Sequence, residues 1–282
     1  DPPPDRPTHQ RDVTCRQLAR DGRGDARAGG GEVDDGADLG AVQDAARGRP
    51  DLLRWTPFLG ELPVSVLNVE RPDFMQEEDI RIFEDAVAKF FEQNAPPETV
   101  DKWRAQHCVD RDMWTKAGEA GLLCASMPEE YGGAGGTFAH EAVINREFAL
   151  GGFDTFGAPL HSDIVAPYIL HYGTEEQKKR WLPNLATGEM VGAIAMTEPG
   201  TGSDLQGVRT SAKKSGNGYV LNGSKTFITN GQHANLVIVV AKTDPKAGAK
   251  GTSLFVVETD DAQGFRRGRK LKKLGMDSAD TS

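Results

Sequence analysis

The sequence predicts an α+β protein, in which an N-terminal helical domain is followed by an antiparallel β-domain built as a sandwich or small barrel. Between residues 73 and 188 the apolar residues recur with the period of a helix. After Gly192 they alternate with the period of two that is typical of strands. We therefore expect a helical domain at residues 71–190 and a β-domain, incomplete at its end, at residues 191–282.

Residues 1–70 follow neither pattern. They are rich in Pro, Gly, Arg and Asp, and the apolar stretch near their end is interrupted by prolines. Such a composition buries too little apolar surface to offset the conformational entropy that is lost on folding. We expect this region to be disordered, or to be an extension that is foreign to the rest of the chain.

The helical domain is expected to contain five helices. They cover residues 77–93, 110–121, 138–150, 162–173 and 174–183. The first helix carries its apolar residues on one face, and Pro96 stops it. Ser162 is the expected cap of the fourth helix. Thr174 and Gln177 form a capping box that opens the fifth helix, which is expected to end near Pro183.

The region of period two predicts a hairpin and two further strands. Asn222 and Gly223 fit the two central positions of a hairpin turn. The expected strands cover residues 219–221, 224–229, 234–243 and 252–259. Several short strands with turn signals between them are typical of an antiparallel sheet or a small barrel.

Charge and composition exclude several classes of protein. Lys and Arg number 33 against 42 Asp and Glu, which gives a net charge of −9. An acidic chain is a poor general nucleic-acid binder, because binding to phosphates needs clustered basic residues. The one basic stretch, residues 266–273, either ends a strand in solvent or meets a phosphorylated small molecule. No apolar run reaches the ~20 residues that cross a membrane.

The cysteines and histidines indicate neither a disulfide framework nor a metal site. Cys15, Cys108 and Cys124 are widely spaced and odd in number, which fits a reducing compartment. Four histidines lack the spacing of metal ligands and are interpreted as surface or hydrogen-bonded residues. These are His107, His140, His161 and His171. The glycine-rich loop 132–136 does not match the dinucleotide-binding fingerprint.

The richest local signal lies at residues 193–207, where the helical period gives way to the strand period. Pro199 sets φ for a turn, and Gly200 and Gly202 let backbone N–H groups come close to a ligand. Three hydroxyl groups surround this turn: those of Thr197, Thr201 and Ser203. Because ligand clefts favour domain junctions, the stretch is either a binding loop or a plain interdomain turn.

A second signal lies in the predicted strand 224–229. Strand alternation places Phe227 and Thr229 on one face, with Thr226, Ile228 and Asn230 on the other. A flat apolar ring with a hydroxyl ~7 Å further along the same face suits a flat heteroaromatic group with polar edges, such as a flavin. Ordinary core packing is the alternative interpretation of the Phe227 ring.

Three ordered motifs resemble the acyl-CoA dehydrogenase family, and most closely its long-chain group. They are AMTEPGTGSDLQG at residues 195–207, LNGSKTFITNG at residues 221–231, and GRKLKKLG at residues 268–275, followed by Asp-Thr at 280–281. The stretch at residues 173–189 also matches the family. The likeness extends over residues 73–282 and fails over the residues before them.

This resemblance implies a fold, a cofactor and a site. Members of the family have a helical domain, a middle β-domain and a C-terminal four-helix bundle, and they usually form homotetramers. FAD lies between the β-domain and the bundle, and the bundle is absent from this chain. The residues that match flavin-binding positions are Ile194, Ala195, Met196, Thr197, Gly202, Ser203, Phe227, Ile228 and Thr229. Ser203 also matches a residue that contacts the acyl-CoA, and Phe227 replaces a frequent Trp by another aromatic ring.

The resemblance also implies a reaction. It is the α,β-dehydrogenation of an acyl-CoA thioester of medium or long chain in fatty-acid β-oxidation, and the electrons pass to an electron-transfer flavoprotein. A glutamate of the family removes the α-proton, and its place lies beyond residue 282. Glu198 and Glu258 are assigned to a turn and a strand end. We therefore expect an N-terminal fragment that contains no catalytic residue and is inactive alone.

Two other interpretations stay open at this point. The chain is alternatively part of an acyl-CoA oxidase or a nitroalkane-oxidase-like flavoenzyme, or it is a truncated remnant without catalytic activity. The expected compartment is a bacterial cytoplasm, because the start of the chain does not look like a transit peptide. Its arginine content leaves the mitochondrial matrix as the alternative.

Overall fold

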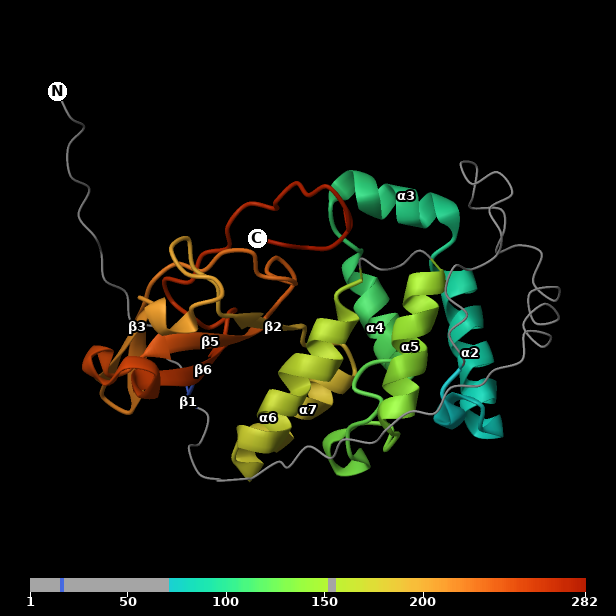
Figure 1. The fold of residues 1–282 in the computed structure, drawn as a ribbon, viewed down its shortest axis with the longest axis horizontal. Coiled ribbons are helices and arrows are strands. Elements are labelled where there is room, and N and C mark those ends of the chain that lie inside the picture. Colours follow the sequence, from blue (N-terminus) through green and yellow to red (C-terminus); the bar gives the residue numbers. More distant parts are fainter. Residues whose placement is uncertain (1–15, 18–70, 152–155) are drawn as a thin grey trace, which may run out of the picture. The chain divides into compact units, whose positions relative to one another are not determined.

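The computed structural model describes residues 16–17, 71–151 and 156–282, which carry the helices and strands labelled in Figure 1. Residues 73–282 belong to one compact unit, and this unit includes the short strand β1 (Arg16–Gln17). Apart from β1, the expectation of disorder for residues 1–70 lies outside the described residues.

Helices fill the first half of the described chain. They are α2 (Glu78–Asn94), α3 (Pro97–Gln106), α4 (Arg111–Glu119), α5 (Phe138–Leu150), the π-helix η5 (Leu160–Val165), α6 (Ala166–Tyr172) and α7 (Glu175–Ala186). Helices α2 and α5 run side by side, and their rings Phe91 and Phe148 lie 4.6 Å apart in the core. None of the described helices is both long enough and apolar enough to cross a membrane.

One helix was not predicted, and one cap was predicted at the wrong residue. Helix α3 was not expected, and Pro97 stands at its first position, where a missing N–H costs no helical hydrogen bond. Ser162 is not a helix cap. It lies inside η5, and its hydroxyl accepts from the backbone N–H of Cys124 over 3.0 Å. The sequence pattern missed the π-helical turn because this turn has no distinct residue periodicity.

The start of α7 agrees with the prediction, and its end does not. The Thr174 hydroxyl accepts from the Gln177 N–H over 3.3 Å, and the Gln177 side chain accepts from the Thr174 N–H over 2.9 Å. This confirms the capping box. The helix continues through Pro183 to Ala186. The fully buried side chain of Leu185 shows that packing outweighs the helix-breaking tendency of proline here.

The β-domain is a mixed sheet and not a purely antiparallel one. Its remaining strands are β2 (Gly192–Ala195), β3 (Ser211–Ser215), β4 (Gly218–Asn222), β5 (Leu236–Lys242) and β6 (Thr252–Glu258). The order is β1-β6-β5-β3-β4, with β2 also on β5. Strands β2 and β3 each pair with β5 in parallel, and the other pairs are antiparallel. Parallel pairing needs a long connection, and residues 196–235 supply it between β2 and β5.

The hairpin was predicted at the wrong place in the sequence. Strands β3 and β4 form the hairpin, and the chain turns at Gly216 and Asn217 instead of at Asn222 and Gly223. Gly216 has φ 55°, which a glycine adopts without strain. The predicted strand 224–229 is not a strand, so the alternation argument for its side chains loses its basis. The prediction failed because the sequence offers two turn-forming pairs close together, Gly216-Asn217 and Asn222-Gly223, and the fold uses the first.

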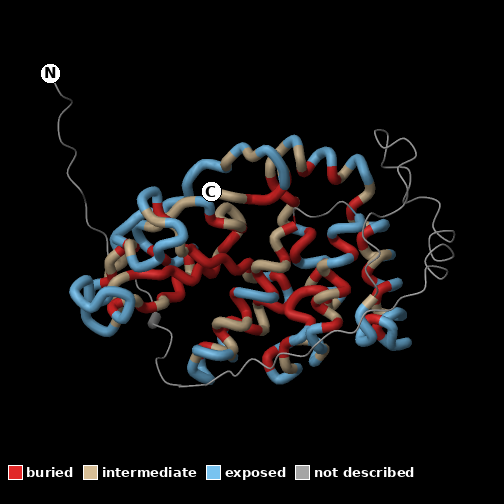
Figure 2. Tube along the Cα trace, viewed as in Figure 1, coloured by how far each residue is buried: buried red, intermediate tan, exposed pale blue. Residues whose placement is uncertain are grey.

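Both faces of the sheet are covered by apolar side chains. On one face, Ile238 and Val256 pack with residues of η5, α6 and α7, among them the fully buried Trp181. On the other face, Val239 and Phe255 pack with β2 and with partly buried residues of β4. Figure 2 shows buried residues along the central strands and along the inner sides of the helices. This packing holds β2 in the core up to Ala195, after which the chain becomes more exposed.

Candidate functional site

The two segments singled out by the sequence lie next to each other in the structure. Where β2 ends, the carbonyl of Thr197 accepts from the backbone N–H of Thr226 over 3.0 Å. The Lys225 ammonium donates to the carbonyl of Met196 over 2.8 Å. Residues 225–230 therefore run beside the end of β2, although about thirty residues separate the two in sequence.

A tight turn follows β2. The backbone groups of Glu198 and Thr201 exchange two hydrogen bonds of 2.9 and 3.0 Å. Gly200 lies within this turn and Gly202 directly after it, and a Cβ atom added to either would meet nothing within 4 Å. The backbone around these glycines is therefore open to solvent, as a binding loop requires.

The Glu198 carboxylate has a structural role in this turn. It accepts from the backbone N–H groups of Arg209 over 2.7 Å and Thr210 over 2.9 Å, and from the Lys225 ammonium over 2.9 Å. Burial alone would raise the pKa of Glu198, but these hydrogen bonds outweigh burial and lower it to about 2. A carboxylate held in this way is a poor proton acceptor near neutral pH, so Glu198 does not act as a general base.

Phe227 is exposed in the second segment. The residue is 67% exposed, and its φ of 59° lies in the left-handed region that residues with a Cβ rarely adopt. Its neighbour Ile228 is buried and Thr229 is half-buried. The Phe227 ring is therefore not part of the core formed by the described residues. An exposed aromatic residue with a strained backbone supports the hypothesis of a binding function.

The structure distributes the predicted site residues over three environments. Ile194 and Ala195 are buried in β2, Met196 and Thr197 are half-buried at its end, and Gly202 and Ser203 are exposed beyond the turn. A backbone bond from Thr226 and a side-chain bond from Lys225 hold the Met196–Thr197 region beside the residues just before Phe227. Together they offer an exposed ring, half-buried hydroxyls and unobstructed glycines. Groups of these types are chemically suited to a flat heteroaromatic ring with polar edges, such as a flavin.

Asn230 is a residue of this region to which the sequence assigned no role. Its amide donates to the carbonyls of Gly157 and Gly192, each over 3.0 Å, and its own N–H donates to the carbonyl of Asp280 over 2.7 Å. It is 2% exposed and has φ 64°. Asparagine tolerates this conformation better than other residues with a Cβ. The Asn230-Gly231 pair, a sequence typical of turns, was the signal that could have identified it.

The end of the chain pairs with the second segment. Ile228 and Ser282 exchange two backbone hydrogen bonds, of 2.7 and 3.1 Å, and Thr229 forms a bridge with Thr281. The Asp-Thr pair that contributed to the family resemblance therefore lies beside the predicted flavin-binding residues. The second segment is therefore bonded both to the region of β2 and to residues 280–282.

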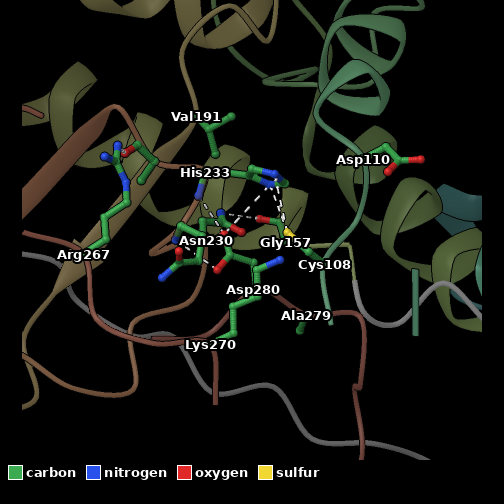
Figure 3. A network of polar contacts seen from close by, with 12 residues as sticks. Cys108, Asp110, Gly157, Val191, Asn230, His233, Arg267, Lys270, Ala279 and Asp280 are labelled. Atoms are coloured by element: carbon green, nitrogen blue, oxygen red, sulfur yellow. Dashed lines mark hydrogen bonds and ion pairs between the residues drawn. The ribbon is translucent and has the colours of Figure 1, made fainter. Parts of the chain in front are cut away.

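A network of Cys108, His233 and Asp280 lies next to this region (Figure 3). The sulfur of Cys108 is 3.5 Å from Nε2 of His233, and one ligand atom from each residue lies within 4.8 Å of the others. The carboxylate of Asp280 accepts from the backbone N–H of Gln232 over 2.9 Å and of His233 over 2.8 Å. Sequence spacing could not reveal this group, because its members are 125 and 47 residues apart.

The Cys108 thiol is protonated in this network. Burial, followed by the charge of Asp280, raises the pKa of Cys108 to about 11. A protonated buried thiol is a weak nucleophile, and the Asp280 carboxylate is already occupied by backbone donors. The network therefore joins the loop after α3 to the loop before β5 and to the end of the chain.

Comparisons with known proteins agree with this architecture. The family model of the acyl-CoA dehydrogenase N-terminal domain matches residues 77–189, and that of the acyl-CoA dehydrogenase middle domain matches residues 193–282. The boundary between them falls at the start of β2, where the fold changes from helices to strands.

Individual relatives give the same result. The mitochondrial long-chain specific acyl-CoA dehydrogenase of Mus musculus is 49% identical over 74% of this chain and 48% of its own length. A solved acyl-CoA dehydrogenase of Geobacillus kaustophilus is 50% identical, with a TM-score of 0.70 over 73% of this chain and 54% of its own. A glutaryl-CoA dehydrogenase of Mycobacterium smegmatis in complex with FADH2 is 31% identical, with a TM-score of 0.67 over 74% of this chain and 52% of its own. The chain spans about half the length of the curated relatives it matches.

Proposed function

Because the chain belongs to the acyl-CoA dehydrogenase family, we propose that it forms the helical domain and the flavin-binding β-domain of a FAD-dependent acyl-CoA dehydrogenase. The substrate is an acyl-CoA thioester of medium or long chain, which loses hydrogen at its α and β carbons in fatty-acid β-oxidation. The observation that supports this most strongly is the pairing of the Thr197 region with the segment that exposes Phe227.

The chain's own residues bind and orient the cofactor in this proposal. The Phe227 ring provides a flat apolar contact, and the hydroxyls of Thr197 and Thr229 donate to or accept from polar edges of the flavin. The neighbouring residues Ile194 and Ile228 are buried in two separate core clusters. Bound FAD supplies the redox chemistry, and the protein supplies position and electrostatics.

The acyl-CoA contact is assigned to the exposed turn beyond β2. Ser203 offers a hydroxyl there, and the neighbouring Gly202 leaves space for the close approach of a ligand. Its likeness to a substrate-contacting position of the family supports this assignment. The acyl chain length then depends on the helical domain, and the long-chain relative of Mus musculus favours a long chain.

The proposal assigns no catalytic base to the described residues. Glu198 is held by backbone donors and by Lys225, and Glu258 accepts from the indole N–H of Trp181 over 2.6 Å. Both carboxylates therefore have structural partners. We expect this chain to bind FAD without turning over substrate by itself.

The remaining features of the proposal concern partners and compartment. The electron acceptor is an electron-transfer flavoprotein, and the assembled enzyme is a homotetramer in a bacterial cytoplasm or a mitochondrial matrix. The family membership supports the acceptor and the assembly, and the mitochondrial relative of Mus musculus supports the second compartment.

The test is to express the full gene product that carries this sequence and to purify it with FAD. The proposal predicts yellow protein, a thermal stabilisation that grows with FAD concentration, and oxidation of long-chain acyl-CoA with an artificial electron acceptor. Under the same conditions this 282-residue chain alone binds FAD without turnover. A colourless full product without stabilisation by FAD would reject the proposal, and peroxide formation with oxygen as acceptor would indicate an oxidase.

A further inference from the structure

Lys225 is a buried cation at the junction of the two segments. Its side chain is 11% exposed, and the side chain of its partner Glu198 is 6% exposed. The ammonium donates to the Glu198 carboxylate over 2.9 Å and to the carbonyl of Met196 over 2.8 Å. One side chain thus contacts both the residue directly after β2 and the turn that begins at Glu198.

This ion pair is a poor means of stabilising a fold. Removal of an ammonium and a carboxylate from water costs several kcal/mol for each ion, and apolar residues of similar volume often give equal or greater stability. Burial accordingly lowers the pKa of Lys225 from its ordinary value, although Glu198 acts in the opposite direction. The ion pair instead fixes the position of residue 225 relative to the turn at Glu198, because its hydrogen bonds are directional.

The place of Lys225 in the chain makes this fixed position relevant to the proposed cofactor site. The next residue, Thr226, donates its N–H to the carbonyl of Thr197, and the exposed Phe227 follows directly. At the far end of the segment, Asn230 donates to the carbonyl of Gly192 over 3.0 Å. Contacts at both ends therefore set the separation of Phe227 and Thr197, and Lys225 provides the charged contact at one end.

We propose that Lys225 is a positioning residue of the flavin site, which holds Thr197 and Phe227 at the separation that the flavin ring requires. This inference rests on the proposed function, since it assumes that FAD occupies the region between the two segments. Lys225 itself does not contact the cofactor. Its effect passes through Met196 and Glu198 on one side and through Thr226 on the other.

The experiment compares Lys225→Met with wild-type protein and with Lys213→Met, a control that removes an exposed lysine from β3. The full gene product is stripped of FAD, and the Kd for FAD, the absorption spectrum of the bound flavin and the Tm of the FAD-free protein are measured. We expect Lys225→Met to raise the Kd about tenfold and to change the flavin spectrum. We expect Lys213→Met to leave all three unchanged, and Lys225→Arg to recover part of the affinity.

The outcomes separate the two proposals. If the wild-type protein does not bind FAD, the proposed function fails and this inference fails with it. If the wild type binds FAD and Lys225→Met lowers only the Tm, with the Kd and the spectrum unchanged, Lys225 has a structural role alone and the inference is overturned. If Lys225→Met does not fold, Glu198→Gln is tested in its place, because it removes the charge of the partner of Lys225. An unchanged Kd for FAD and an unchanged flavin spectrum in Glu198→Gln would then overturn the inference.

Discussion

The side-chain amide of Asn230 donates to the backbone carbonyl of Gly192 over 3.0 Å and so joins the second segment to the start of β2. Replacement by alanine removes this bond and the one to Gly157, and it leaves an alanine at φ 64°. We expect Asn230→Ala to lower the free energy of unfolding by about 3 kcal/mol. Urea unfolding at neutral pH measures the loss.

Two further variants identify the cause of that loss. Asn230→Gly removes the same hydrogen bonds without the penalty of a left-handed alanine, so it should destabilise less than Asn230→Ala. Asn222→Ala, at the exposed end of β4, should change the free energy of unfolding by less than about 0.5 kcal/mol. A loss at Asn230 no larger than at Asn222 would contradict the described hydrogen bonds.

Glu258 connects the end of β6 to α7. Its carboxylate accepts from the buried indole N–H of Trp181 over 2.6 Å and receives two bonds from Arg180. Glu258→Ala leaves the indole N–H without this acceptor, and we expect a loss of about 2 kcal/mol in the free energy of unfolding. Glu258→Gln keeps a carbonyl oxygen for the indole and should lose clearly less. Equal losses in the two variants would assign the effect to the charge pair with Arg180, not to the indole.

His161 should make stability depend on pH. Its Nδ1 accepts from the N–H of Gly192 over 2.9 Å, and Nε2 lies 3.0 Å from the carbonyl of Leu185, so the fold needs the neutral ring. Burial lowers the pKa of His161 from 6.5 to about 4. The unfolded chain therefore binds a proton in this interval that the folded chain does not. This contribution, roughly 3 kcal/mol, is complete above pH 6.5 and is lost as the pH falls to 4.

The measurement compares wild type and His161→Gln by urea unfolding between pH 4 and pH 7.5. A comparison is needed because burial raises the pKa of Glu141 from 4.5 to about 7, which makes the folded state less stable as the pH rises through the same range. His161→Gln should be less stable at pH 7.5, and the difference should shrink at lower pH. Parallel curves would show that His161 does not titrate on unfolding.

The two cysteines of the described region should be unreactive in the folded protein. Cys108 and Cys124 are 4% and 1% exposed, and burial raises the pKa of both thiols, that of Cys108 to about 11. In a Cys15→Ser background, both should react with a thiol reagent at least ~100-fold more slowly at pH 8 than in denaturant. One fast-reacting thiol in the folded protein would contradict the packing described for its site.

Much of the fold could be predicted from local patterns. The capping box of Thr174 and Gln177 has a definite side-chain chemistry, and β5 and β6 are continuous apolar runs of strand length. The β3–β4 hairpin could not be placed correctly, because Gly216-Asn217 and Asn222-Gly223 are both turn sequences and the fold uses the one with the weaker local signal. Pairing of Ser211 with Lys242 of β5, which lies far away in sequence, fixes where β3 runs.

The site was predictable in a different way. The family resemblance predicted that residues near Thr197 and Phe227 belong to one site. The argument from strand alternation was based on a wrong premise, since residues 224–229 form no strand. Their cofactor role stays a prediction. The contacts that hold them, those of Lys225 and Asn230, depend on distances that spacing along the chain does not contain. Long-range contacts of this kind decide a site's geometry and leave no local pattern.

The most direct measurement is a crystal structure of the full gene product purified with FAD. The account predicts that one isoalloxazine ring contacts the Phe227 side chain, the Thr197 region and Thr229 together. A flavin bound elsewhere, or a structure in which these three residues face separate cavities, would contradict it.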